Sequence, residues 1–373
     1  MEVLEPLCIP LGKSTSGFGF DAHLSASDDS LTSGFLDTSF WRIKSYGCVE
    51  STNLFIKDAL AQGTEEGLCV VALQQSGGYG RQGHAWKSPL GGLYTSFALY
   101  PLRRGVTLDK LPLLSLVMSV ALRRALRYFC DDSQLAIKWP NDVLFKGGKI
   151  AGISLEAVSG GVCVGIGINV FSFQDCAADA LGKYRPSYVW DAQTNSVEGI
   201  QLDLQPDLQP GDSAKGFQPS FQPVDRVDDH QAGFQEADSA ESLQSGDAQN
   251  DGSIQSCKQN AQDQPTDLNS SQRSLMVQLL MRMLYEVQQC YEVWCKKGFE
   301  EFLDEYRAHM AFVGDGATLE ALDGSVFAEG TIIGVDGEGK LLIKTASGQS
   351  VAAHSGEVHV RTLRTAKNKA EHD

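Results

Sequence analysis

The segment 162–170 alternates between bulky apolar residues and residues with almost no side chain. Successive side chains of a strand point to opposite faces, so one face carries Val162, Val164, Ile166, Ile168 and Val170. The other face carries Cys163, Gly165, Gly167 and Asn169. The apolar face must pack on helices, and two interpretations of the bare face stand. It leaves room for a ligand, or its glycines relieve tight packing.

The segments around this strand predict a mixture of strands and helices. Short apolar runs predict strands at 40–45, 68–73, 93–99, 136–139 and 150–158. A helix should begin at Ser51-Thr52-Asn53 and end at Gly63, because Ser is a good N-cap and Gly a common stop. Helical spacing of apolar residues predicts further helices at 112–129, 273–294 and 299–310.

The last part of the chain has a different pattern. Five short alternating runs separated by Gly-rich turns occupy 317–321, 328–333, 341–344, 349–352 and 357–361. Five strands within about fifty residues are typical of a small barrel. We therefore predict an SH3-like β-barrel at 313–364.

Charge is concentrated in one segment. Residues 195–270 hold fourteen Asp or Glu against three Lys or Arg, which is −11 of the net charge of −16. Residues 193–272 are also rich in Gln, Ser and Pro, and such a composition buries too little apolar surface to fold. We predict a disordered acidic insert there, and a flexible segment at 1–39. Neither the acidic segment nor the remainder of the chain, with a net charge of about −5, has the basic face that binding to nucleic acid requires.

The cysteines and the hydropathy exclude other classes of protein. The nine cysteines form no CxxC pair and no cluster with metal-ligand spacing, so we expect free thiols in a reducing compartment. No apolar stretch is long enough for a membrane span, and the first ten residues lack a secretory pattern. A cytoplasmic location follows as an expectation.

Three motifs carry chemistry. The loop 76–85 combines four glycines with Arg81, which suits contact with phosphate oxygens, although it lacks both the Walker and the Rossmann spacing. Lys149 follows a Gly-Gly turn and would attract two anions, unless it is only a solvated lysine. Asn141 and Asp142 would serve either as turn formers or near a nucleotide and Mg²⁺.

Taken together, these motifs closely resemble the biotin–protein ligase family. In chain order they are Ser51-Thr-Asn, Gln75-x-Gly-Gly-x-Gly-Arg-Gln-Gly, Lys138-Trp-Pro-Asn-Asp, Gly148-Lys-Ile-Ala-Gly-Ile153 and Gly165-Ile-Gly-Ile-Asn169. The resemblance covers about 40–175 and resumes at about 275–361. It implies an α/β (α+β) catalytic domain at 40–192 and 273–312, with a mixed sheet like that of class II aminoacyl-tRNA synthetases and flanking helices.

The resemblance also implies an activity. Members of the family join biotin to ATP, with Mg²⁺, to form biotinyl-5′-AMP, and then transfer biotin to a lysine of a biotin carboxyl carrier domain. Lys149 and Arg81 would be catalytic. The biotin-binding residues would be Ser51, Thr52, Asn53, Gln75, Tyr79, Gly80, Arg81, Lys149, Gly152, Gly165 and Gly167. The nucleotide-binding residues would be Arg81, Trp86, Asn141, Asp142, Lys149 and Asn169, and Asp142 would also bind the metal.

Two positions depart from the family pattern. The family loop usually reads Gly-Arg-Gly-Arg-x-Gly-Arg, whereas Tyr79 and His84 replace its first and last arginines here. Only Arg81 keeps its charge at pH 7, so we expect a Tyr79→Arg variant to hold biotinyl-AMP longer.

Alternatives to this function stay open. They are a lipoate or octanoate ligase of the same superfamily, and a catalytically weak regulator that binds biotin. The segment before the catalytic domain has no helix-turn-helix pattern, so we expect no DNA-binding role. A homodimer is a further possibility.

Overall fold

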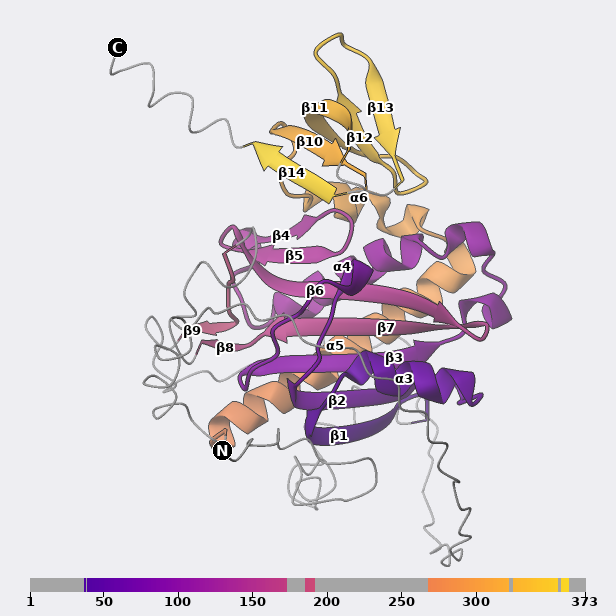
Figure 1. Cartoon of the computed structure of the whole chain (residues 1–373), viewed down its shortest axis with the longest axis vertical. Coiled ribbons are helices and arrows are strands. Elements are labelled where there is room, and N and C mark those ends of the chain that lie inside the picture. Colours follow the sequence, from indigo (N-terminus) through magenta and orange to yellow (C-terminus); the bar gives the residue numbers. More distant parts are fainter. Residues whose placement is uncertain are drawn as a thin grey trace, which may run out of the picture. The chain divides into compact units, whose positions relative to one another are not determined.

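A seven-stranded mixed sheet organises the fold, in the order β1-β2-β3-β7-β6-β5-β4 (Figure 1). The structure is a computed structural model that describes residues 37, 39–172, 185–191, 268–321, 325–354 and 357–361. β1 and β2 are parallel, and the other neighbours in this sheet are antiparallel. The strands are β1 (Arg42–Val49), β2 (Leu68–Gln75), β3 (Gly92–Leu99), β4 (Leu135–Lys138), β5 (Asp142–Phe145), β6 (Gly148–Val158) and β7 (Gly161–Asn169).

The parallel pair β1 and β2 requires a crossover connection, and α3 (Thr52–Ala61) provides it. Ser51 has the extended backbone of an N-cap, as the sequence predicted, although its side chain makes no capping hydrogen bond. α3 turns Thr52, Asn53, Ile56 and Leu60 inward. Two polar side chains therefore lie against the sheet at the N-terminal end of this helix.

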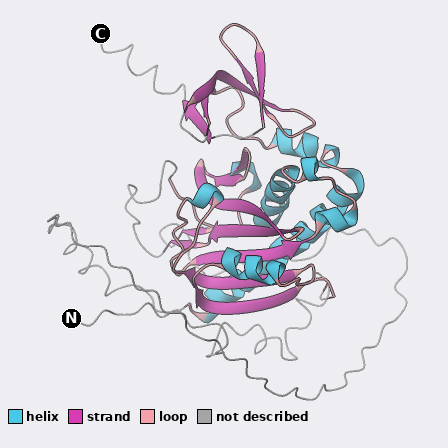
Figure 2. Cartoon of the chain, turned by 45° about the vertical axis from the view of Figure 1, so that its right-hand side comes forward, coloured by secondary structure: helices cyan, strands magenta, loops and turns pink. Residues whose placement is uncertain are grey.

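The apolar face of β7 lies in the main core, as its alternation predicted. Its four large residues, and Val170 directly after it, are 4% exposed or less and pack with residues of α4 (Leu113–Leu126) and α5 (Ser270–Lys297). Helices cover both faces of the sheet (Figure 2). α6 (Glu300–Ala308) follows α5. Short 3-10 helices occupy Arg81–Gly83, Pro101–Arg104, Leu108–Lys110 and Asp132–Gln134, and β8 (Phe171–Ser172) pairs with β9 (Trp190–Asp191).

Several elements differ from the sequence-based expectation, among them β1, which spans 42–49 rather than 40–45, and β8 and β9, which were not predicted. β5 was not predicted, because its four residues follow Pro140-Asn141 directly and form the second arm of a tight hairpin with β4. α5 begins at Ser270 rather than Arg273. A capping box between Asn269 and Gln272 starts the helix inside a segment whose composition resembles that of the acidic insert.

A second, antiparallel sheet contains the five strands predicted for the C-terminal part. They are β10 (Gly316–Glu320), β11 (Val326–Val335), β12 (Leu341–Lys344), β13 (Ser350–Ala353) and β14 (Glu357–Arg361), in the order β13-β12-β11-β10-β14. Trp139 Nε1 donates a hydrogen bond to the carbonyl of Gly339 at 2.9 Å, and Arg307 donates to the carbonyl of Val335. These bonds connect the second sheet to the turn after β4 and to α6.

The predicted segments 1–39 and 193–272 lie outside the described residues, apart from 37, 39 and 268–272. Within the described residues, the six cysteines are free thiols, as expected. None of the described helices is long and apolar enough to cross a membrane.

Candidate active site

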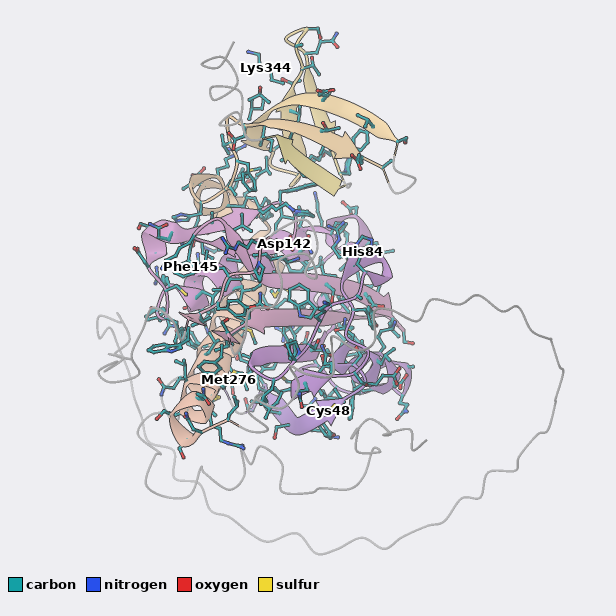
Figure 3. The ribbon with its side chains drawn as sticks, turned by 60° about the vertical axis from the view of Figure 1, so that its left-hand side comes forward. Cys48, His84, Asp142, Phe145, Met276 and Lys344 are labelled. Carbon is teal, nitrogen blue, oxygen red and sulfur yellow. The ribbon has the colours of Figure 1, made fainter. Side chains whose placement is uncertain are left out.

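A cavity of about 480 Å³ lies over the bare face of β7, and its volume suits a small-molecule ligand. Its walls come from α3, β3, β6, β7, the loop after β2 and the turn between β4 and β5, with Val358 added from β14. Residues from distant parts of the sequence therefore surround one space. Figure 3 labels Asp142 of β5 and His84 of the loop, which both line it.

A cluster of hydroxyl and amide groups forms one end of the cavity. Ser96 Oγ, fully buried on β3, lies 2.7 Å from Thr52 Oγ1 and 2.6 Å from Asn53 Oδ1. An amide oxygen only accepts, so Ser96 donates to Asn53. Asn53 Nδ2 in turn donates to Ser154 Oγ at 3.1 Å. Thr52 donates through N and Oγ1 to Gln75 Oε1 at 2.8 and 3.1 Å. This end is already ordered for a ligand with several polar atoms.

The glycines of the bare face allow side chains to approach the sheet closely. A Cβ at Gly165 would lie 2.1 Å from Asn53 Oδ1, and one at Gly167 would lie 2.7 Å from Trp86 Nε1. A Cβ at Gly152 would lie 2.9 Å from Trp86 Cζ3. The indole of Trp86 therefore covers the glycine floor in this structure. Its buried Nε1 makes no hydrogen bond within the described structure.

Charged residues form the other end. Lys149 Nζ lies 2.7 Å from Asp142 Oδ1, and Lys138 Nζ lies 3.7 Å from Asp142 Oδ2. Lys149 Nζ is also 4.9 Å from the centre of the Trp86 ring. Two ammonium groups share one carboxylate, so this end can attract a further anion.

The loop 78–86 closes over the floor as a small hairpin. Gly80 N donates to His84 O at 2.8 Å, and Trp86 N donates to Gly78 O at 2.9 Å. Arg81 Nη1 donates to Asn141 Oδ1 at 3.0 Å, which brings the predicted loop arginine to the predicted Asn-Asp turn. Asn141 is held by a second bond, from Nδ2 to Ile153 O at 2.7 Å.

Tyr79 points to the polar end rather than to Lys149. Lys57 Nζ lies 3.3 Å from the Tyr79 hydroxyl and 2.6 Å from Glu156 Oε2. The hydrogen bond with Glu156 raises the pKa of Lys57 to about 12. Tyr79 therefore contacts Lys57 at the polar end, and the slower loss of biotinyl-AMP expected for Tyr79→Arg stays a prediction.

Most of the predicted site residues line this one cavity. They are Thr52, Asn53, Gln75, Tyr79, Gly80, Arg81, Trp86, Asn141, Asp142, Lys149, Gly152, Gly165 and Gly167. Ser51 and Asn169 do not line it. Ser51 is buried at the start of α3, and Asn169 Nδ2 donates to the carbonyl of Lys149 at 3.1 Å. Asn169 therefore supports the backbone of Lys149.

Sequence reasoning missed several residues of the cavity and its rim. Ser96, Ser154 and Lys138 line the cavity, while Lys57 and Glu156 contact Tyr79 beside it. One signal was available for Ser96, because a Thr-Ser pair interrupts the apolar strand 93–99. Another was available for Ser154 and Glu156, which share a face of their strand with Gly152.

The described residues offer a metal ion few ligands. Asp142 is the one carboxylate among the described residues that line the cavity, and both its oxygens face lysines. Within those described residues, no group of three His, Cys, Asp or Glu is placed to hold a metal. This donor set fits a Mg²⁺ held mainly by phosphate oxygens, with Asp142 as a single protein ligand.

Comparison with known proteins gives matches for the segment that forms the cavity and for the C-terminal sheet. Residues 46–170 match the biotin/lipoate A/B protein ligase family, and residues 318–361 match the biotin protein ligase C-terminal domain. A biotin–[acetyl-CoA-carboxylase] ligase of Paracoccus denitrificans is 38% identical over 152 residues, which is 39% of this chain and 62% of that protein. A bifunctional ligase/repressor of Bacillus spizizenii is 34% identical, over 36% of this chain and 42% of that protein.

These matches span less than two thirds of either relative's length. The fold also resembles a solved structure, the biotin protein ligase of Aquifex aeolicus in complex with biotin and ATP. That chain is 21% identical, with a TM-score of 0.55, and the match covers 86% of this chain and 99% of that one.

Proposed function

We propose that the chain, whose residues 46–170 match the biotin/lipoate A/B protein ligase family, is an ATP-dependent biotin–protein ligase. One observation carries the proposal. A single cavity has a hydroxyl and amide cluster at one end and a lysine pair at the other, joined by a glycine floor. Biotin has the same polarity, with a polar ureido ring at one end and a carboxylate at the other.

The polar end suits the ureido ring. Ser96, Asn53 and Ser154 already share hydrogen bonds, so little ordering would be needed on binding. A dithiolane ring or a simple alkyl chain would place apolar atoms against these polar groups and gain no hydrogen bond from them, which disfavours such a ligand relative to biotin. The lipoate and octanoate alternatives are therefore less well supported than biotin.

The charged end suits adenylation. In the proposed reaction a carboxylate oxygen of biotin attacks the α-phosphorus of ATP, the bond to the bridging oxygen breaks, and pyrophosphate leaves. Lys149 would hold the two anions together, and Asp142 would keep its ammonium group in place. Arg81 would face the phosphate from the loop. Mg²⁺ would arrive with ATP, with Asp142 as its protein ligand.

The second step transfers biotin to a protein. A lysine amine attacks the carbonyl carbon of the mixed anhydride, AMP leaves, and the nitrogen loses a proton to give an amide. We propose a biotin carboxyl carrier domain as the acceptor. The homodimer, the cytoplasmic location and the lack of a nucleic-acid partner stay predictions, as do the domain boundaries given above.

Pyrophosphate release tests the proposal directly. The purified chain with Mg-ATP should release pyrophosphate when biotin is added, and far less with lipoate or octanoate. Adding a carrier domain should give labelled carrier, and Lys149→Ala should abolish both signals. Equal release with lipoate would support the alternative ligase. Biotin binding without any AMP formation would support the catalytically weak regulator.

A further inference from the structure

Three side chains from three separate elements meet beside the polar end of the cavity. Lys57 comes from α3, Glu156 from β6 and Tyr79 from the loop 78–86. Lys57 Nζ lies 2.6 Å from Glu156 Oε2 and 3.3 Å from the Tyr79 hydroxyl, and it is 5.7 Å from the centre of the Tyr79 ring. Tyr79 of the loop thus contacts an ion pair that joins the helix α3 to the strand β6.

This cluster is separate from the lysine pair at the charged end. Gly152, Ser154 and Glu156 occupy one face of β6, because alternate residues of a strand share a face. Glu156 is four residues beyond Gly152, which is about 13 Å along the strand. Lys57 is one helical turn beyond Asn53. The cluster therefore lies past Asn53 and Ser154, where the polar end closes.

The phenol suits this position because it both donates and accepts a hydrogen bond. It accepts from the ammonium group of Lys57 and interacts with the carboxylate of Glu156. Burial, followed by the hydrogen bond with Glu156, raises the pKa of Tyr79, so the phenol stays protonated at neutral pH. An arginine at position 79 would instead bring a second cation beside Lys57.

The loop is also held from its other side. Arg81 donates to Asn141 at the charged end, and the Trp86 indole lies over Gly152 and Gly167. Tyr79 precedes Arg81 by two residues, and its backbone bridges to Ala85 across the loop hairpin. Loss of the contacts of Tyr79 with Lys57 and Glu156 therefore frees the first arm of the loop hairpin. The same hairpin carries Arg81 and Trp86.

We propose that Tyr79, Lys57 and Glu156 form a latch that holds the loop 78–86 closed over the cavity. Tyr79 is then a positioning residue, and the Lys57–Glu156 pair is its anchor. For the ligase reaction, which rests on the proposed function, the latch slows escape of biotinyl-AMP. In the family pattern an arginine stands where this chain has Tyr79, and we expected that arginine to help retain biotinyl-AMP. The latch would retain it instead.

The first experiment uses the full chain without ligands. Trypsin should cleave after Arg81 faster when the loop opens, because Arg81 is half-buried and bonded to Asn141 in the closed loop. Mass spectrometry follows the peptide that ends at Arg81. Tyr79→Phe and Lys57→Met should each raise the cleavage rate about tenfold, while Lys57→Arg, which keeps the cation, should restore it. Lys44→Gln is the matched control, because Lys44 contacts the ring of Phe55 on the same helix as Lys57. Thermal unfolding of each variant confirms that it is folded.

A second comparison tests whether the three residues act together. Glu156→Gln alone should open the loop, and adding Tyr79→Phe should then increase cleavage no further, since both changes break one latch. Cleavage of Tyr79→Phe at the wild-type rate would overturn the proposal. So would fully multiplicative effects in the double variant, because independent contacts would produce them.

The functional readout is the release rate of preformed biotinyl-AMP. Tyr79→Phe should release it about tenfold faster, which corresponds to about 1.4 kcal/mol, with KM for ATP changed much less. Unchanged release from an opened loop would reject the retention role. If the wild type forms no biotinyl-AMP, the proposed function fails, while the cleavage assay still decides on the latch.

Discussion

The ion pair of Lys149 and Asp142 gives the sharpest test of the mechanism. Lys149 Nζ is 2.7 Å from Asp142, and Lys138 Nζ is 3.7 Å from its other oxygen. At an effective dielectric constant of about 20, these pairs attract by about 6 and 4.5 kcal/mol. Lys149→Met therefore leaves Asp142 with about two fifths of its cation attraction.

The expected losses of stability and of activity differ widely. Lys149 is 26% exposed in its side chain, so solvent screens the pair, and Lys138 still compensates the carboxylate. We expect Lys149→Met to lower the free energy of unfolding by only about 1 kcal/mol, well below the loss for a fully buried pair. Its biotin-dependent activity should fall about 100-fold to 1,000-fold, the effect of losing a charge that stabilises the transition state.

Urea unfolding and biotin-dependent exchange of pyrophosphate into ATP measure the two losses. Asp142→Asn supplies the other arm of a double-mutant cycle. The double variant should recover the stability lost by Lys149→Met, because no carboxylate is left to compensate, but it should recover no activity. The reasoning fails if Lys149→Met keeps more than a tenth of the exchange activity, or if the double variant regains it.

Three further predictions concern the floor and a distant carboxylate. Gly165→Ala places a Cβ 2.1 Å from Asn53 Oδ1, so calorimetry should show at least tenfold weaker biotin binding; unchanged affinity would show that Asn53 does not contact biotin. Gly167→Ala should push Trp86 off the floor and move its fluorescence to longer wavelength, whereas an unchanged spectrum would place the indole elsewhere. Burial alone would raise the pKa of Glu66, but hydrogen bonds from Arg104 and Tyr291 lower it below the usual value of 4.5. The stability that ionised Glu66 contributes is present at a pH above its pKa in the unfolded chain. It is lost as the pH falls through the lowered pKa of Glu66 in the folded chain. Glu66→Gln should therefore destabilise the fold at pH 7 and much less at pH 3, and an equal loss in urea unfolding at both values would contradict the assignment.

Much of the fold follows from local patterns in the sequence. Period-two alternation and apolar runs located six of the seven strands in the first sheet and all five in the second. β5 escaped because four residues between two turns carry too little periodicity. The start of α5 escaped because the capping box lies in a segment of polar composition. β5 and the start of α5 were both missed because a short local pattern lies beside a longer pattern that predicts a turn or a disordered segment.

The site was predictable only in part. The motifs indicated the loop, Lys149 and the Asn141–Asp142 turn, because unusual residue types cluster there. Lys57 carried no such signal, because a lysine on a helix is ordinary at a protein surface. Glu156 carried only its place on the strand face that Gly152 and Ser154 share. Their relation to Tyr79 depends on how α3, β6 and the loop meet.

The bare face of β7 shows where sequence information ends. The alternation by itself determined that Gly165 and Gly167 share one face and that five apolar side chains share the other, because the side-chain period of a strand is two. Only the tertiary structure decided which side chains pack over these glycines. Asn53 reaches Ser154 across 101 positions of sequence, and Tyr79 reaches Lys57 across 22. Such contacts depend on the order of the strands and the crossover through α3, which no local pattern encodes.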